Sequence, residues 1–153
     1  MKLRPIHSKM SIKGHPIHPA LIHVPIGALV GVVATDLGFI FSGDLFWARA
    51  GLWLAGVGAL MGFLAGIVGL VELLSVRSIR RLITGWCHGL MAVMLMSLAS
   101  FNWMIRLEDP GAVIMPWGLY LSVLCGVLTA VTASLGGHLV YEHGVGMTED
   151  VPK

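Results

Sequence analysis

Four long apolar stretches dominate the chain and leave little sequence for any other structure. They cover residues 20–41, 50–74, 82–105 and 116–140 of the 153-residue sequence. Each is close to the roughly 20 residues that cross the hydrocarbon core of a bilayer as a helix. With 56% hydrophobic and 12% charged residues, the chain has too little polar surface for a water-soluble domain. The sequence therefore predicts an all-α integral membrane protein in which residues 1–153 form one antiparallel four-helix bundle.

The basic residues are distributed unevenly between the two predicted membrane faces. Only Arg49 and Arg106 fall on one face. The other face carries Lys2, Arg4, Lys9, Lys13, Arg77, Arg80, Arg81 and Lys153. Because short loops rich in Lys and Arg stay in the cytoplasm, we expect both termini there. The net charge of +2 comes from these flanking residues, so it indicates a lipid bilayer with anionic headgroups as the partner, and no nucleic acid.

Histidines gather toward one membrane face once the four spans are folded. The members of this group are His15, His18, His23, His88, His138 and His143. Glu72 is expected at the same level, because it closes the second span. Ionisable residues inside a membrane usually mark a functional site, and imidazole is a common ligand of haem iron and of metal ions. The cluster predicts a cofactor site near the cytoplasmic face.

The start of the first span and the small residues of three spans favour such a site. Pro16 or Pro19 is expected to begin the first helix, and Pro25 to weaken its hydrogen bonding and bend it beside His23. Small residues at four-residue spacing let membrane helices approach closely, and they also leave room for a planar macrocycle. The stripes are His23, Gly27, Gly31 and Thr35; Gly58, Gly62 and Gly66, followed by Glu72; and Gly126, Ala130, Ser134 and His138.

His88 is the best candidate for an axial haem ligand, because it lies roughly 9 Å inside the third span. The preferred partner is His23 or His138, whose levels match that of His88 in an antiparallel bundle. His18 and His15 are alternates, or would hold the haem propionates together with Arg77, Arg80 or Arg81. Without a Cys-x-x-Cys-His motif, a haem would be held noncovalently.

Two acidic residues are candidates for supporting roles. Glu72 would orient a ligand imidazole through its second ring nitrogen, or would pair with Arg77 or Arg80. Asp36 lies in the outer half of the first span, roughly 20 Å from His23, which is too far to bind the same ion. It is expected to be a buried carboxyl, protonated or paired with Asn102 or Arg106, and the alternative is a role in a proton path.

Three segments resemble an uncharacterised bacterial family of predicted four-span membrane proteins. They are HPIHPALIHVPIGALVGVVATDL in the first span, GLVELL at the end of the second, and LGGHLVYEHGVGM at the end of the fourth. The resemblance covers residues 14–147 and selects His15, His18, Asp36, Glu72, His88, Asn102, His138 and His143. Some members are fused to Rieske iron–sulfur domains. The resemblance therefore implies a multi-pass protein of the bacterial inner membrane with a respiratory or Rieske-type redox partner, and gives His143 a role that its position alone does not.

These observations leave three hypotheses for function. The leading one is a small protein of electron transfer that holds one haem b through two of His18, His23, His88 and His138. The second is a zinc, iron or copper site built from three or four of His15, His18, His23, His88 and His138, with Glu72. The third is an accessory subunit of a membrane complex. Hydrolytic or transfer catalysis is not expected, and redox chemistry with a quinone is the one enzymatic activity that such a site would allow.

Overall fold

The computed structural model describes residues 5–147, and four long apolar helical segments account for most of them. These segments are Ile17–Ser42, Leu45–Ser75, Ile83–Ile105 and Ile114–Tyr141. The prediction of an all-α four-span bundle is therefore confirmed. The first, second and fourth segments begin two to five residues earlier than predicted, because residues that flank the apolar stretches also belong to the helices. Lys2, Arg4 and Lys153 lie outside the described residues.

Two of the spans are continuous helices and two are divided. The first span consists of α1 (Ile17–Leu21) and α2 (His23–Ser42), and the second is α3 (Leu45–Ser75). A short helix, α4 (Arg77–Arg80), leads into α5 (Ile83–Ile105). The fourth span consists of the π-helical turn η1 (Ile114–Gly118) and α6 (Leu119–Tyr141).

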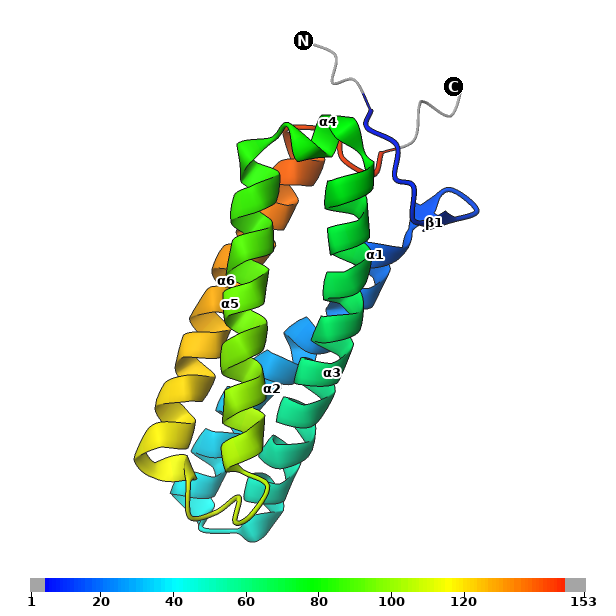
Figure 1. Cartoon of the computed structure of the whole chain (residues 1–153). Helices are drawn as coiled ribbons and strands as arrows, with labels where there is room; N and C mark the ends of the chain where they lie inside the picture. The colour runs from blue at the N-terminus through cyan, green and yellow to red at the C-terminus, as the bar shows by residue number, and fades with distance from the viewer. Residues whose placement is uncertain (1–4, 148–153) are drawn as a thin grey trace.

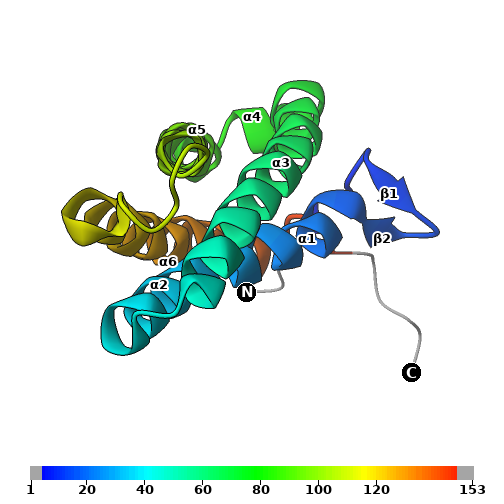
Figure 2. The same cartoon turned by 90° about the horizontal axis from the view of Figure 1, so that it is seen from below.

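Neighbouring spans run in opposite directions, so that the start of α1, the end of α3, α4, the start of α5 and the end of α6 lie at one end of the molecule (Figure 1). We call this end the histidine end, since it carries His15, His18, His88, His138 and His143. Seen from the opposite end, α5 runs along the line of sight and α3 crosses α2 at an angle (Figure 2). The predicted convergence of distant histidines toward one end of the bundle agrees with this arrangement.

The first span is interrupted beside His23, as the prolines predict. Pro16 is the extended residue before α1, and Ile22 separates α1 from α2. Pro25 has no N–H to donate to the carbonyl of Leu21, so the helical ladder loses a bond at this point. His18 and His23 lie on opposite sides of the interruption, and this position determines their different surroundings.

The segment before α1 folds across the histidine end in a way that the sequence analysis did not predict. Strands β1 (Ser11–Ile12) and β2 (His15–Pro16) form a hairpin. Lys13 and Gly14 have φ values of 50° and 80°, as the two central residues of a type I′ turn require. Earlier in the chain, Ile6 forms backbone hydrogen bonds with Gly144 and Gly146 and so joins this segment to the residues after α6.

Buried residues between the ends show which of the predicted small-residue stripes pack. On α3, Gly58 and Gly62 are buried against Leu29 and Met96, as predicted, but the third glycine of the stripe, Gly66, is exposed, so the prediction for the second span is confirmed only in part. On α6 the predicted stripe is exposed at Ala130, Ser134 and His138, and that prediction is wrong. The buried side of α6 carries Ser122, Cys125, Thr129 and Thr132. The hydroxyls of Thr129 and Thr132 each bond to a carbonyl one turn earlier, so these residues pack against their neighbours as apolar groups.

Candidate functional site

The structure places the imidazoles of His18 and His88 beside each other at the histidine end. His18 belongs to the first turn of α1, and His88 lies five residues after the start of α5. The two ring centres are 6.1 Å apart and the ring planes are perpendicular, at 90°. Both side chains are half-buried. Two histidines separated by 70 positions in the sequence thus lie side by side as one pair of imidazoles.

Each ring of this pair is held by one backbone carbonyl. Nδ1 of His18 donates to the carbonyl of Ala65 on α3 at 2.8 Å, and Nδ1 of His88 donates to the carbonyl of Thr132 on α6 at 3.0 Å. A carbonyl only accepts hydrogen bonds, so in the neutral imidazole the proton sits on Nδ1. This tautomer leaves the Nε2 lone pair of each ring available to a metal ion. Metal-binding histidines generally have the same Nδ1–H hydrogen bond, which orients the ring.

A glycine one turn after each acceptor carbonyl makes both hydrogen bonds possible. A Cβ atom at Gly69 would lie 3.0 Å from Nδ1 and Cε1 of His18, and one at Gly136 would lie 3.2 Å from Cε1 of His88. A helical side chain covers the turn that precedes it, so any side chain at these positions would shield the carbonyl four residues earlier. The same solution occurs on α3 and on α6. The predicted small-residue stripes did not include Gly69 or Gly136. The signal in the sequence that could have identified them is a glycine four residues after a position that lies at the same membrane depth as the histidines.

An apolar cavity adjoins the two imidazoles. Its volume is about 550 Å³, and both rings contribute to its wall. Most of the remaining wall is apolar, and it includes Ser97, Thr129 and Thr132, whose hydroxyls each bond to a carbonyl of their own helix. The wall residues from the first three spans include Pro25, Leu29, Gly62, Gly66, Leu95 and Met96. The volume falls in the range of small-molecule and cofactor sites.

The cavity opens on the apolar outer surface between α3 and α5. Phe63 and Leu70 on α3, and Leu90 and Val93 on α5, line the cavity and are also half or more exposed. In a bilayer this surface faces lipid. A planar apolar molecule would therefore reach the two histidines from the side of the bundle.

The other predicted histidine ligands lie apart from this pair. His23 is exposed, with Nδ1 3.4 Å from the carbonyl of Ala20. His15 is exposed at the start of β2, with Nδ1 3.1 Å from the carbonyl of Lys13. His23 follows His18 by five residues, which turns it by about 140° around a helix. It therefore points away from α3 and α5 when His18 points toward them. The preferred pairing of His88 with His23 or His138 is not the one that the structure forms.

His138 and His143 form a second pair. Their ring centres are 5.3 Å apart, with an angle of 81° between the ring planes. Within residues 5–147, no group of three or more His, Cys, Asp and Glu side chains lies close enough to share a metal ion. The two histidine pairs are thus separate arrangements.

Glu72 lies at the histidine end, as predicted, but its partners come from the N-terminal segment. Oε1 accepts hydrogen bonds from the hydroxyl of Ser8 and from the backbone N–H of Met10. Oε2 is buried and has no hydrogen-bond partner among residues 5–147. Over the same residues, Glu72 forms no ion pair with Arg77 or Arg80. Glu72 therefore attaches the segment before α1 to the end of α3.

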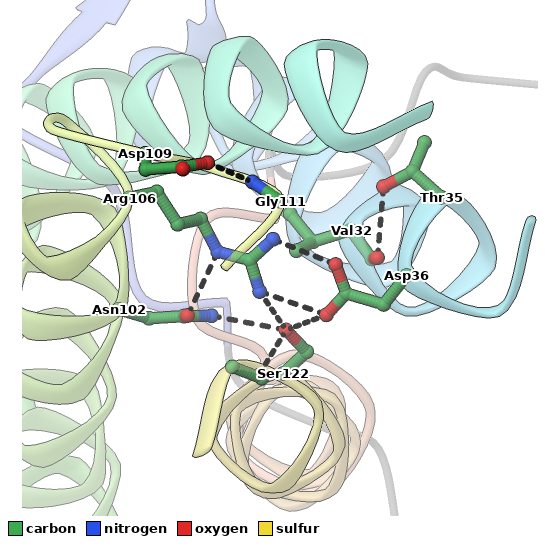
Figure 3. Close-up of polar contacts among 9 residues, drawn as sticks. Val32, Thr35, Asp36, Asn102, Arg106, Asp109, Gly111 and Ser122 are labelled. Carbon is green, nitrogen blue, oxygen red and sulfur yellow. Dashed lines mark hydrogen bonds and ion pairs between the residues drawn. The ribbon is translucent and has the colours of Figure 1, made fainter. Parts of the chain in front are cut away.

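Asp36 and Arg106 form a fully buried ion pair near the opposite end of the bundle (Figure 3). Arg106 donates to the two carboxylate oxygens of Asp36 at 2.6 and 2.8 Å, and to Oδ1 of Asn102 at 3.0 Å. The hydroxyl of Ser122 accepts from Arg106 and lies 2.7 Å from Oδ2 of Asp36. The predicted partnership of Asp36 with Asn102 or Arg106 is thus confirmed for Arg106, whose guanidinium donates to both carboxylate oxygens as a two-pronged ion pair.

Because Arg106 is buried in this cluster, fewer basic side chains are exposed at this end of the bundle than the sequence alone suggests. The sequence alone places Arg106 among the basic residues of the outer face, but its side chain is 0% exposed. Arg49 therefore remains as the exposed arginine of this end within the described residues. Arg106, the residue directly after α5, follows His88 by 18 residues, or about 27 Å along a helix, so the ion pair and the paired histidines are separate sites.

Comparisons with known proteins agree with the membrane topology. Residues 14–149 match the family described as "Predicted membrane protein (DUF2231)". No curated protein and no solved structure has a significant match to the chain.

Proposed function

Because the chain belongs to the family of predicted membrane proteins DUF2231, its function must be argued from its own site, and we propose that it is a membrane electron-transfer protein that holds one haem b. The axial ligands would be Nε2 of His18 and Nε2 of His88. The observation that carries the proposal is the pairing of these two rings beside an apolar cavity, each with Nδ1 bonded to a backbone carbonyl.

The spacing of the rings supports coordination of one ion between them. Two imidazoles that bind a metal ion from opposite sides, at about 2.0 Å each, have ring centres roughly 6 Å apart. The observed distance between the centres is 6.1 Å. When bound, the haem iron would supply reversible one-electron chemistry. The protein would orient both ligands, exclude water with the apolar wall and so influence the reduction potential.

The residues around the cavity suit the porphyrin ring and the propionates of a haem. Gly66 leaves space on the α3 wall, since a Cβ atom there would have no neighbour within 4 Å, and a flat group requires such space. Arg77, Arg80 and Arg81 lie on and beside α4, which joins the two helices that border the cavity opening, and all three are exposed. They would pair with the carboxylates of the haem propionates.

The distribution of basic residues supports an orientation with the histidine end in the cytoplasm. This end carries Lys9, Lys13, Arg77, Arg80 and Arg81, whereas the burial of Arg106 leaves Arg49 exposed at the other. By the positive-inside rule, both termini would be cytoplasmic in a bacterial inner membrane. The haem would then exchange electrons near that face with a respiratory or Rieske-type partner, or with a quinone that arrives through the lipid.

Haem content of the purified protein tests the proposal. We expect the tag-free chain, purified in mild detergent from haem-replete cells, to contain one haem per chain and to show a Soret band that shifts on reduction. Gly66→Leu should abolish this haem, because Gly66 lines the cavity and a Cβ atom there would have no neighbour within 4 Å, so the leucine side chain would extend into the space that the haem needs.

Gly27→Leu is the matched control for this experiment. Gly27 is also a glycine of a spanning helix, and a Cβ atom there would likewise have no neighbour within 4 Å, but Gly27 does not line the cavity. This variant should keep the wild-type haem content. A colourless wild-type protein would refute the haem proposal and favour an accessory subunit. Equal haem content in the two variants would show that the haem does not occupy this cavity.

A further inference from the structure

The second histidine pair, His138 and His143, has the geometry of a metal site that is independent of the cavity. Of the histidines at this end, His15, His18, His23 and His88 each have Nδ1 directed at a backbone carbonyl. By contrast, the ring nitrogens of His138 and His143 have no hydrogen-bond partner among residues 5–147. Both rings therefore keep their ligand atoms available. We propose that this pair binds a divalent transition-metal ion such as Cu²⁺ or Zn²⁺.

The distance between the rings distinguishes this pair from the first. Two imidazoles in adjacent positions of a tetrahedral ion, at about 2.0 Å each, have ring centres roughly 5 Å apart. The observed distance is 5.3 Å, which is shorter than the 6.1 Å of the pair formed by His18 and His88. The two pairs thus fit different coordination: adjacent ligands here, and opposite ligands at the cavity.

The backbone around His143 holds the pair in place. After α6 ends at Tyr141, the N–H of Gly144 donates to Val140 and the N–H of Val145 donates to Leu139, so the chain folds back over the last helical turn. Gly144 has a φ of 67°, which favours glycine. Backbone hydrogen bonds from Ile6 to Gly144 and from Gly146 to Ile6 attach this turn to the N-terminal segment. A ligand pair that is already ordered loses less entropy when a metal binds.

The exposure of His138 and His143 and the chemistry of imidazole indicate which metal ions this pair prefers. His138 is exposed and His143 is half-buried, so water can occupy the remaining coordination positions. Imidazole suits copper, nickel and zinc, and the affinity of such sites is greatest for Cu²⁺. With two protein ligands, the site would exchange its metal with the surroundings.

Calorimetric titration of the tag-free protein with Cu²⁺ and with Zn²⁺ tests this site. We expect one metal ion per chain, with Cu²⁺ bound more tightly than Zn²⁺. His138→Gln and His143→Gln should each weaken binding by at least about tenfold, in line with the loss of a ligand from a small site. Each single variant keeps one imidazole of the pair, which cannot chelate the metal on its own. The double variant should therefore bind the metal about as weakly as either single variant.

Two controls separate this site from the other histidines. His15→Gln changes an exposed histidine of the same end and should leave metal binding unchanged. His18→Gln should also leave it unchanged, whether or not the protein contains haem. Wild-type binding that persists in both His138→Gln and His143→Gln, or the absence of saturable binding in the wild-type protein, would overturn the proposal.

Discussion

If the protein holds the proposed haem, replacing either His18 or His88 with alanine should remove it, and this is the largest change that we expect in the protein. Both imidazoles are needed for six-coordinate iron, and each is oriented by a different helix, α3 for His18 and α6 for His88. We expect each variant to retain less than about a tenth of the wild-type haem content, measured as the haem-to-protein ratio after purification in the same detergent.

Three other histidines provide the controls for these variants. His15→Ala, His23→Ala and His138→Ala should keep the wild-type ratio, because these rings lie outside the cavity. Adding free imidazole to His18→Gly should restore part of the Soret absorbance, since the vacated space lies beside the cavity. Loss of haem in His23→Ala together with its retention in His18→Ala would contradict the assignment.

Replacing Arg106 with leucine has the largest expected effect on stability. The substitution would leave the carboxylate of Asp36 charged, fully buried and without its guanidinium partner. Removing one partner of a buried ion pair typically costs about 3–5 kcal/mol, because the remaining charge is uncompensated. The midpoint of unfolding in a detergent titration, followed by circular dichroism, measures this loss.

A double variant and a surface variant complete the experiment. Asp36→Leu combined with Arg106→Leu should recover much of the lost stability, because it removes the buried charge as well as its partner. Arg49→Leu, an exposed arginine at the same end, should change the free energy of unfolding by no more than about 0.5 kcal/mol. Equal stability of Arg106→Leu and Arg49→Leu would show that the ion pair does not contribute.

The topology could be predicted from the sequence because it depends on the length and composition of whole segments. The four apolar stretches predicted the four spans, and the prolines of the first span predicted the interruption near His23. The partnership of Asp36 with Arg106 was also predictable. A buried carboxylate in a membrane needs a cation, and Arg106 was a basic residue available at its level.

The choice of histidine pair could not be predicted, because it depends on the direction in which each side chain points. His18 and His23 lie five residues apart on the first span, and the direction of each ring depends on how the chain turns at the interruption at Ile22. The acceptor carbonyls of Ala65 and Thr132 belong to the backbone and leave no residue type to recognise. Only the glycines that uncover them, Gly69 and Gly136, are visible in the sequence.

The partners of Glu72 escaped prediction for a related reason. The basic N-terminal segment has no apolar periodicity, so nothing in it indicated a hairpin or a fixed path across the bundle. Its hydrogen bonds come from one hydroxyl and one backbone N–H, at Ser8 and Met10. The charge of Glu72 suggested an arginine partner, whereas the geometry of the chain provided neutral donors.

Electron paramagnetic resonance of the oxidised protein tests the coordination of one iron by His18 and His88 most directly. Because the two ring planes are perpendicular, at 90°, the account predicts a low-spin ferric signal of the strongly anisotropic kind that perpendicular axial imidazoles produce. A high-spin ferric signal, or no haem signal from protein prepared in haem-replete cells, would contradict it.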